Sequence, residues 1–455
     1  MLRVYGLGDP VLDIVARVGH ELLEQLGAEP GGCLPVTAEE MAVLLALPEV
    51  QADMKRVPGG SAANVMKCLA SLAGAGSSPS STDDSSSNVS SSGSASSSAG
   101  GSPGARLAVH FVGMVGSDDV AEEYERSISA HGVGPLLLRP TPQEAHGALP
   151  GAAENGGGSA AALPTATCLC LVTPDGQRTM RTSLGAALQL RQPAQLPPPL
   201  QGGASAGAAR QQADGAQPQQ PQHPQQPAAA GAAACSSAPG PWALLHCEGY
   251  CLYRAEVAAA AMRVARAVGA RVSLDLASFE VIFSCWARLD ELLQEGLVDI
   301  VFCNEQEAQA LCEASGVALS SPCPAERAVA AAQDSLLSRG ASTVVVSRGS
   351  RGCTARSVGS SEVHASASKV SVVDTVGAGD FFTAGFLYAL LSNASLQACA
   401  LSGCAAGTAA VQVAGAELGP ERLRELRSAI GNILQAAASR EAAAAPALAG
   451  GNALA

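Results

Sequence analysis

From residue 242 onward, short apolar runs alternate regularly with segments of helical periodicity. The runs read ALLHCEGY, RVSLDLAS, DIVFCN and TVVVSRG, and amphipathic stretches separate them. Runs too apolar to alternate are typical of strands buried on both faces, and helices between them imply parallel crossovers. The pattern predicts an α/β fold with a doubly wound, mostly parallel sheet, helices on both faces, and ligands at the carboxyl ends of the strands.

The N-terminal half adds strands of two kinds. Apolar runs at residues 3–7 and 107–115 suit the buried sheet, whereas alternating segments at 14–36, 134–139 and 165–173 suit a small, half-exposed sheet. Pro174, Asp175 and Gly176 indicate a hairpin turn. We expect an α/β core of residues 1–12, 37–76, 105–133 and 241–435, and a small β-sheet lid of residues 13–36, 134–149 and 163–190.

Three tracts have no apolar periodicity. Residues 77–104 are mostly Ser, Gly and Ala, and residues 150–162 and 191–240 are rich in Gly, Ala, Gln and Pro. Such compositions bury too little apolar surface to offset chain entropy. We expect all three to be disordered inserts, and residues 436–455 to form a flexible tail.

The strongest chemical signal is VVDTVGAGDFFTAGFL at residues 372–387, a strand-like run that breaks into glycines and resumes at helical spacing. Gly377, Ala378 and Gly379 allow successive backbone N–H groups to converge on an anion at a helix N-terminus. Asp380 would repel that anion, which makes sense if its carboxylate accepts a proton from an attacking hydroxyl. The alternative is a glycine-rich turn with aspartate as a helix cap.

Two further stretches have related patterns. Residues 57–72, VPGGSAANVMKCLASL, place a Gly-Gly turn before a helix that carries Asn64, and residues 299–311, DIVFCNEQEAQAL, place Asn304 and Glu307 after a buried strand. The ordered set of these three motifs resembles the PfkB, or ribokinase-like, family of carbohydrate and nucleoside kinases. The family loop usually carries a second Thr where this chain has Val376, a minor departure because the loop acts through its backbone.

The resemblance implies a role for each motif. It implies an ATP-dependent phosphotransferase with an alcohol acceptor, in which Asp380 is the catalytic base and Gly377, Ala378 and Gly379 form the anion hole. The remaining roles that it implies are acceptor binding by Asp13, Gly59, Gly60 and Asn64, nucleotide binding by Asn304, Glu307, Ser347, Gly349 and Gly352, ordering of Mg²⁺ through water by Glu307, and a K⁺ site at Asp374 with Thr375.

Structural alternatives remain for several of these residues. Asp13 also fits a turn aspartate, Asn304 with Glu307 fits a helix-capping pair, and Gly349 with Gly352 fits a left-handed turn. A catalytically silent PfkB-like regulatory or structural protein is the rival function. Retention of Asp13, Asn64 and Asp380 together argues against it.

Charge and cysteine content limit the kinds of partner and metal site that the chain can be expected to have. The net charge is -13 without a Lys/Arg block, which argues against nucleic acid, and Arg263 and Arg266 interrupt the longest alanine-rich helix, which argues against a membrane span. The 14 cysteines contain no C-x2-C pair, so neither a zinc ribbon nor a disulfide framework is indicated. The first strand begins near Met1, so we expect a cytoplasmic protein, monomeric or homodimeric.

The acceptor is the least determined feature. The opening GLGDPVLDI resembles the adenosine-kinase-like branch, which implies a nucleoside whose 5′-hydroxyl approaches Asp380. Aromatic residues make up only 3% of the chain, leaving Tyr250, Phe279 and residues of the lid as candidates to stack on a base. That scarcity keeps a free sugar, of the ribose or fructose type, as the alternative acceptor.

Overall fold

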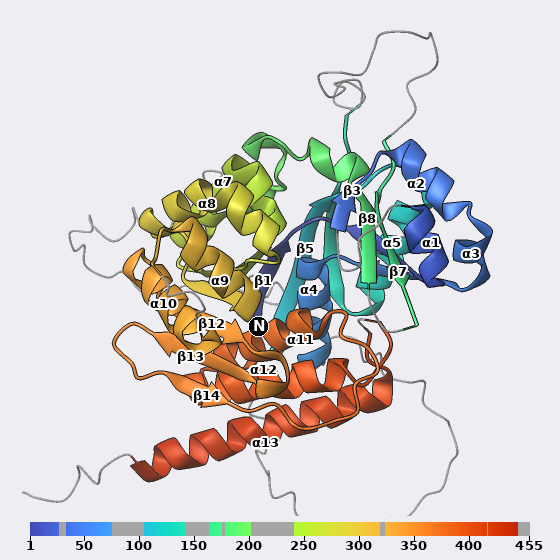
Figure 1. Ribbon diagram of the computed structural model, residues 1–455. Coiled ribbons are helices and arrows are strands. Elements are labelled where there is room, and N and C mark those ends of the chain that lie inside the picture. The colour runs from blue at the N-terminus through green and yellow to red at the C-terminus, as the bar shows by residue number, and fades with distance from the viewer. Residues whose placement is uncertain are drawn as a thin grey trace, which may run out of the picture.

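Two sheets organise the protein (Figure 1). The computed structural model describes residues 1–26, 33–74, 104–141, 163–174, 178–201, 241–318, 324–415 and 417–444. Most of the three expected inserts, and the end of the expected tail, lie outside these residues. The α/β fold class with a second, small sheet is confirmed.

The large sheet has nine strands in the order β14-β13-β12-β11-β10-β9-β1-β5-β6. Its parallel strands are β1 (Leu2–Leu7), β5 (Leu107–Met114), β6 (Val133–Leu138), β9 (Trp242–Glu248), β10 (Arg271–Asp275), β11 (Ile300–Asn304) and β12 (Thr343–Ser347). At one edge β13 (Cys353–Ser357) and β14 (Val363–Ala365) are antiparallel. Continuous apolar runs such as Val344 to Val346, all fully buried, form the centre because helices cover both faces.

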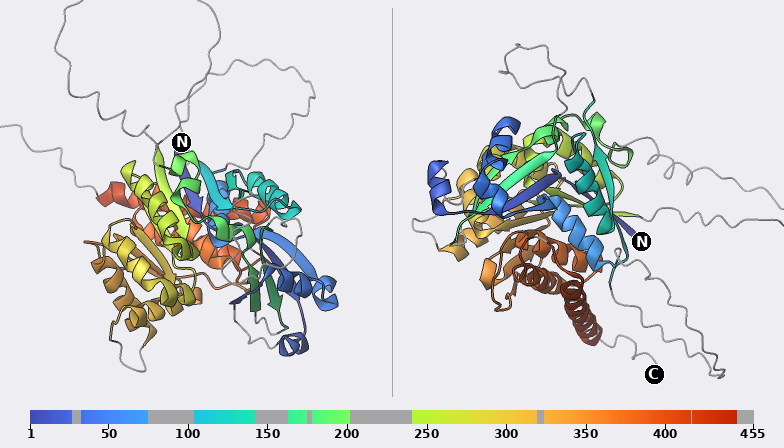
Figure 2. Two further views of the ribbon diagram at one scale, coloured as in Figure 1. Left: turned by 90° about the horizontal axis from the view of Figure 1, so that it is seen from above. Right: turned by 90° about the vertical axis from the view of Figure 1, so that its right-hand side faces the viewer.

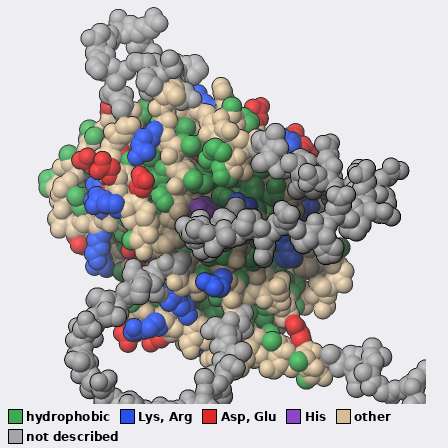
Figure 3. All heavy atoms as spheres, turned by 180° about the vertical axis from the view of Figure 1, so that it is seen from behind, with side chains coloured by type: hydrophobic (Ala, Val, Ile, Leu, Met, Phe, Trp, Pro, Cys, Tyr) green, Lys and Arg blue, Asp and Glu red, His purple; other side chains and the backbone are tan. Residues whose placement is uncertain are grey.

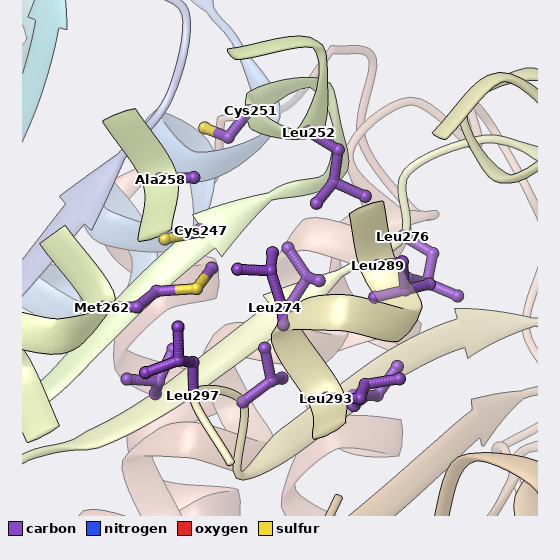
Figure 4. Packing of buried hydrophobic residues seen from close by; sticks show 14 of the residues in the cluster. Cys247, Cys251, Leu252, Ala258, Met262, Leu274, Leu276, Leu289, Leu293 and Leu297 are labelled. Atoms are coloured by element: carbon purple, nitrogen blue, oxygen red, sulfur yellow. The ribbon is translucent and has the colours of Figure 1, made fainter. Parts of the chain in front are cut away.

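One helical layer contains α7 (Ala255–Ala267), α8 (Phe279–Gln294), α9 (Glu305–Ala314) and α10 (Ala325–Ser338). Figure 4 shows its core, where Met262 of α7 and Leu289 of α8 pack with Leu274 of β10. The other layer contains α4 (Ser61–Leu72), α5 (Asp119–Ala130), α11 (Ala378–Leu391), α12 (Leu396–Ala410) and α13 (Pro420–Ala444). Small residues let α11 and α12 approach closely, since a Cβ on Gly385 would lie 2.5 Å from Ser402 O.

The small sheet has the order β3-β8-β7-β2-β4, and Figure 2 shows it with its helices to one side of the core. Its strands are β2 (Val11–Arg17), β3 (Cys33–Pro35), β4 (Met54–Gly59), β7 (Ala166–Val172) and β8 (Arg178–Ser183). The helices α1 (His20–Gln25), α2 (Ala38–Leu45) and α3 (Pro48–Ala52) cover one face, where Leu12 and Ile14 are buried. Because strand side chains alternate, Asp13 lies on the opposite face. We call this unit, residues 11–59 with 166–183, the lid.

The predicted division between core and lid was wrong in two places. Residues 134–139 were assigned to the lid, but β6 pairs with β5 at the edge of the large sheet. An edge strand is half-exposed, so its pattern imitates that of a lid strand. Residues 37–59 were assigned to the core, but α2 and α3 pack on the small sheet and β4 pairs with β2 in the lid. Its sequence, MKRVPG, lacks a regular apolar alternation.

The boundaries of two expected disordered segments also need correction. Residues 191–201 contain the short 3₁₀ helices η2 (Pro193–Gln195) and η3 (Pro198–Leu200). Leu196 and Leu200 are buried in the cluster that includes α7, so isolated leucines anchor a proline-rich stretch. The tail was predicted from residue 436, but α13 continues to Ala444 because alanine favours helix strongly.

Candidate active site

The glycine-rich turn sits directly before α11. Gly377 is the N-cap of α11 in a left-handed conformation, with φ of 69°, which explains why glycine is needed there. Asp380 lies in the first turn. A Cβ on Gly379 would meet nothing within 4 Å, so the space beside this turn is open. A first-turn carboxylate therefore lies at the positive end of the helix, beside a turn that has open space at Gly379.

Asp380 is held by the helix that follows the Gly-Gly turn. Ser61 Oγ donates a hydrogen bond to Asp380 Oδ1 at 2.8 Å, and Asn64 Nδ2 donates one to Oδ2 at 2.9 Å. Burial raises the pKa of Asp380 to about 7, although these hydrogen bonds oppose the shift. Two motifs that are far apart in the sequence thus meet at one carboxylate.

Asp13 approaches the same place from the lid. Burial raises the pKa of Asp13 to about 7, while the Lys67 ammonium opposes this shift. The charge of Asp13 also raises the pKa of Asp380, so the two carboxylates are electrostatic neighbours. The predicted acceptor residue and the predicted base are therefore close enough to influence each other's charge.

The Gly-Gly turn brings lid and core backbones into close approach. A Cβ on Gly60, whose φ is 93°, would lie 2.3 Å from Asp9 O, and a Cβ on Gly59 would lie 2.0 Å from Asp13 Oδ2. Any larger residue would displace one of these neighbours. The two glycines are therefore explained by packing against the strand that carries Asp13.

The Asn304 and Glu307 pair forms a reciprocal capping box at the start of α9. Asn304 Oδ1 accepts from Glu307 N at 2.9 Å, and Glu307 Oε2 accepts from Asn304 N at 2.9 Å. Burial, and then repulsion from Asp275, raises the pKa of Glu307 to about 8. Asp275 accepts a hydrogen bond of 3.1 Å from Thr383 of α11. The pair thus caps a helix and also places a second buried carboxylate beside Asp275.

The predicted nucleotide segment forms the turn between β12 and β13. Ser347 is the register partner of Asn304, and Gly349 and Gly352 have φ of 55° and 87°. A Cβ on Gly352 would lie 1.9 Å from Ala365 O. This geometry accounts for both glycines as turn residues, so their nucleotide role stays a prediction.

Asp374 organises the loop before Gly377. Its Oδ1 accepts from Val376 N and its Oδ2 from Gly415 N, both at 2.9 Å. The carboxylate therefore fastens the loop to the end of the α12 segment. Its predicted role at a K⁺ site stays a prediction.

Sequence reasoning did not assign three residues of this region. Ser61 contacts Asp380, Lys67 is 3% exposed and donates to Pro58 O at 2.6 Å, and Glu248 is 1% exposed. A lysine on the otherwise apolar side of a helix and a glutamate at the end of a buried strand were the available signals. Both charges are too costly to bury without a structural or chemical role.

The described residues contain no cluster of three or more His, Cys, Asp or Glu side chains able to hold a metal. Asp275 and Glu307 are nevertheless two mutually repelling buried carboxylates, a donor set that a divalent cation would relieve. Mg²⁺ commonly uses one or two carboxylates together with waters and nucleotide phosphates. The residues present therefore fit a water-mediated Mg²⁺ site.

The comparisons with known proteins agree with this architecture. Residues 244–422 match the pfkB family of carbohydrate kinases. The ribokinase of Haemophilus influenzae is 31% identical over 157 residues, which are 34% of this chain and 46% of the ribokinase. The chain thus spans about half the length of that relative in this match.

Solved structures share the whole fold. The adenosine kinase from Sinorhizobium meliloti aligns with a TM-score of 0.63 at 24% identity, covering 94% of this chain and 99% of the other. A probable sugar kinase from Rhizobium etli also gives 0.63, at 21% identity and coverages of 94% and 98%. The adenosine kinase from Anopheles gambiae gives 0.60, at 20% identity and coverages of 90% and 96%.

The fold is ribokinase-like: a large, mostly parallel sheet between helices, with a second, small sheet beside it. The part of this fold that matches the pfkB family of carbohydrate kinases is residues 244–422. Phosphorylation of an alcohol group is the general reaction of that family.

Proposed function

We propose that the protein is an ATP-dependent kinase that phosphorylates the hydroxymethyl group of an adenosine-like nucleoside. The observation that carries the proposal is Asp380, a carboxylate at a helix N-terminus beside an open glycine-rich turn, oriented by Ser61 and Asn64. A pKa of about 7 suits a general base that must be ionised and yet accept a proton. The same geometry argues against a catalytically silent protein.

In this mechanism the acceptor hydroxyl lies between Asp380 and the γ-phosphate of ATP. Asp380 accepts the hydroxyl proton as the oxygen attacks in line, and the N–H groups of residues 377–379 stabilise charge on the transferring phosphoryl group. Asp275 and Glu307 would hold Mg²⁺ through water, and the bound ion would supply neutralisation of phosphate charge. The K⁺ site at Asp374 belongs to this proposal as an accessory feature.

The lid supplies the acceptor contacts. Asp13 on β2 would accept hydrogen bonds from ribose hydroxyls, with Gly60 and Asn64 on the core side of the ring. Tyr250 and Phe279, 37% and 40% exposed, follow the carboxyl ends of β9 and β10 and are available to stack on a base. The division into a core and a lid that covers the acceptor is part of the same proposal.

A free sugar of the ribose or fructose type is the second candidate acceptor, favoured by the identity with a ribokinase. Both acceptors present a ring with vicinal hydroxyls and a primary alcohol, so both suit Asp13 and Asp380.

Nucleic acid is not expected as a partner. No helix among the described residues is long and apolar enough to cross a membrane. On the face shown in Figure 3, acidic and basic side chains of the described residues are interspersed. A mixed surface of this kind offers little attraction to nucleic acid.

The decisive experiment is a substrate screen with purified protein, ATP and Mg²⁺. Adenosine and other nucleosides are compared with ribose and fructose by kcat/KM. We expect a nucleoside to be preferred. A preference for a free sugar of more than about tenfold, equivalent to about 1.4 kcal/mol, would overturn the nucleoside assignment. Absence of phosphoryl transfer to every acceptor would overturn the kinase proposal.

A further inference from the structure

The lid and the core are joined at several places rather than by one linker. Among the described elements, the chain passes between them four times: at residues 8–10, at residues 59–61, before β7, and after β8. The relative position of Asp13 in the lid and Asp380 in the core depends on how these connections are fixed.

Arg254 contacts two of the connections at once. It ends the 3₁₀ helix η4 (Gly249–Arg254), and its Nη2 forms an ion pair with Asp9 Oδ1 in the first connection. Its Nη1 donates to Ala187 O at 3.2 Å, in the 3₁₀ helix η1 (Gly185–Gln189) that follows β8. One guanidinium therefore bridges the first and last connections.

Glu248, at the other end of the same short segment, holds Asp9 by its backbone. Glu248 Oε1 accepts from Asp9 N at 2.6 Å, and Oε2 accepts from Ala62 N at 2.9 Å, in the first turn of α4 directly after the second connection. A Cβ on Gly8 would lie 2.7 Å from Glu248 Cδ, so glycine makes room for this carboxylate. Together Glu248 and Arg254 fasten three of the four connections to β9 and η4.

The Arg254 and Asp9 ion pair is far more buried than the ion pair that Arg263 forms on the next helix. The side chains of Arg254 and Asp9 are 11% and 7% exposed, whereas Arg263 of α7 and its partner Glu295 are 56% and 49% exposed. An exposed pair contributes little, but removing one member of a buried pair leaves an uncompensated charge. Arg263 is therefore a matched control for Arg254.

The connections that are fastened in this way lead directly to the candidate site. β2 begins two residues after Asp9 and carries Asp13. Ala62 follows Ser61, which donates to Asp380. A shift at Asp9 or Ala62 would therefore change the distance between the acceptor-binding and catalytic carboxylates.

We propose that Arg254 is a positioning residue that sets the lid relative to the core by bridging Asp9 and Ala187. Its catalytic consequence rests on the kinase function proposed above. Arg254 touches no reacting atom; it acts through the connection that leads to Asp13.

The test compares Arg254→Met, Asp9→Asn, the double variant and Arg263→Met. We expect Arg254→Met to lower the Tm and to raise the acceptor KM about tenfold, as misplaced binding groups do, with the KM for ATP unchanged. The double variant removes both buried charges, so its Tm should return toward that of the wild type. Its acceptor KM should stay raised because the bridge to Ala187 is still missing, and Arg263→Met should match the wild type.

A purely structural role predicts a different outcome. If the acceptor KM of the double variant returns to the wild-type value together with the Tm, or if Arg254→Met leaves the acceptor KM unchanged, the proposal is wrong. Arg254→Lys keeps the positive charge but lacks the planar guanidinium. Its Tm should therefore be closer to the wild-type value than that of Arg254→Met, while its acceptor KM should remain raised.

A second measurement does not depend on activity. Hydrogen exchange should be faster in β2 and η1 of the double variant than in Arg263→Met, while the strands β10 to β12 are unchanged. Should the wild type phosphorylate no acceptor, the kinase proposal fails and exchange alone decides the role of Arg254. If β2 and η1 exchange equally fast in the double variant and in Arg263→Met, the positioning role proposed for Arg254 is wrong.

Discussion

The missing side chain of Gly59 leaves the space that the carboxylate of Asp13 occupies. A Cβ at residue 59 would lie 2.0 Å from Asp13 Oδ2 and 2.9 Å from its Cγ. Gly59 and Val11 are register partners across β4 and β2, and Asp13 is opposite Val57. The Gly-Gly motif thus acts on the acceptor site through sterics as well as through its own backbone.

Gly59→Ala should displace the Asp13 carboxylate. We expect the acceptor KM to rise about tenfold while the KM for ATP is unchanged, because Asp13 is placed on the acceptor side of the site. Gly431→Ala in α13 is the control, since its Cβ would meet nothing within 4 Å. That change should leave both KM values unaltered and stabilise the fold by about 0.5–1 kcal/mol. Steady-state kinetics in which Gly59→Ala behaves like Gly431→Ala would contradict the steric argument.

Asp380→Asn should retain nucleotide binding and lose phosphoryl transfer by on the order of 10²–10⁴-fold, the usual contribution of a positioned general base. In the wild type, kcat/KM should rise with pH and level off above about 7, where Asp380 is ionised. The variant should lack the part of this step that Asp380 contributes, while Asp13 still ionises. Single-turnover assays with labelled ATP measure both effects, with exposed Asp334→Asn as the control. Unchanged transfer in Asp380→Asn would remove this residue from the chemistry.

The stability of the fold should also depend on pH, but it should fall as pH rises, whereas kcat/KM should rise. Burial raises the pKa of Asp13 from 3.8 to about 7, so between these values the folded state binds a proton that the unfolded state has released. The contribution of Asp13 to the free energy of unfolding therefore falls as pH rises from about 4 to about 7. Asp13→Asn should gain stability relative to the wild type, by roughly 2–3 kcal/mol, between pH 5 and pH 8. Urea unfolding at both pH values checks this, and a difference independent of pH would show that Asp13 ionises normally.

Glu307→Gln tests the proposed magnesium site. The amide keeps an oxygen for the capping box but loses the charge, so we expect a higher Mg²⁺ requirement and little loss of stability. Glu313→Gln, farther along α9, is the matched control. Activity measured against free Mg²⁺ at saturating acceptor should separate the two variants. Identical curves would limit Glu307 to capping.

The proximity of the glycine-containing motifs was easier to predict from the sequence than the boundaries of the fold. The glycine-rich turn before Asp380 and the Gly-Gly turn before Asn64 could be recognised because each combines a backbone requirement with a polar residue at fixed spacing. The structure brings Asn64 within 2.9 Å of Asp380, and the motif order had implied that these two residues serve one site.

What the sequence could not predict depends on tertiary contacts. β4 and β6 were exchanged between core and lid because edge strands have weak apolar patterns, and pairing partners are set by the whole sheet. The Arg254 and Asp9 pair joins residues far apart in the chain, and Arg254 lies in none of the motifs recognised in the sequence. Leu196 and Leu200 are single apolar anchors in a stretch whose average composition resembles a disordered segment.

The discontinuous lid also has a consequence for how the chain folds. β2 pairs in parallel with β7, joining Val11 to Ala166, so the centre of the lid cannot form until β7 has been synthesised. Pairing of such distant segments must first overcome loop-closure entropy, and it raises the contact order and slows folding. By then β1 and β5 of the core are already available to pair. The lid should therefore assemble as part of one cooperative unit with the core, and a separately expressed lid should not fold.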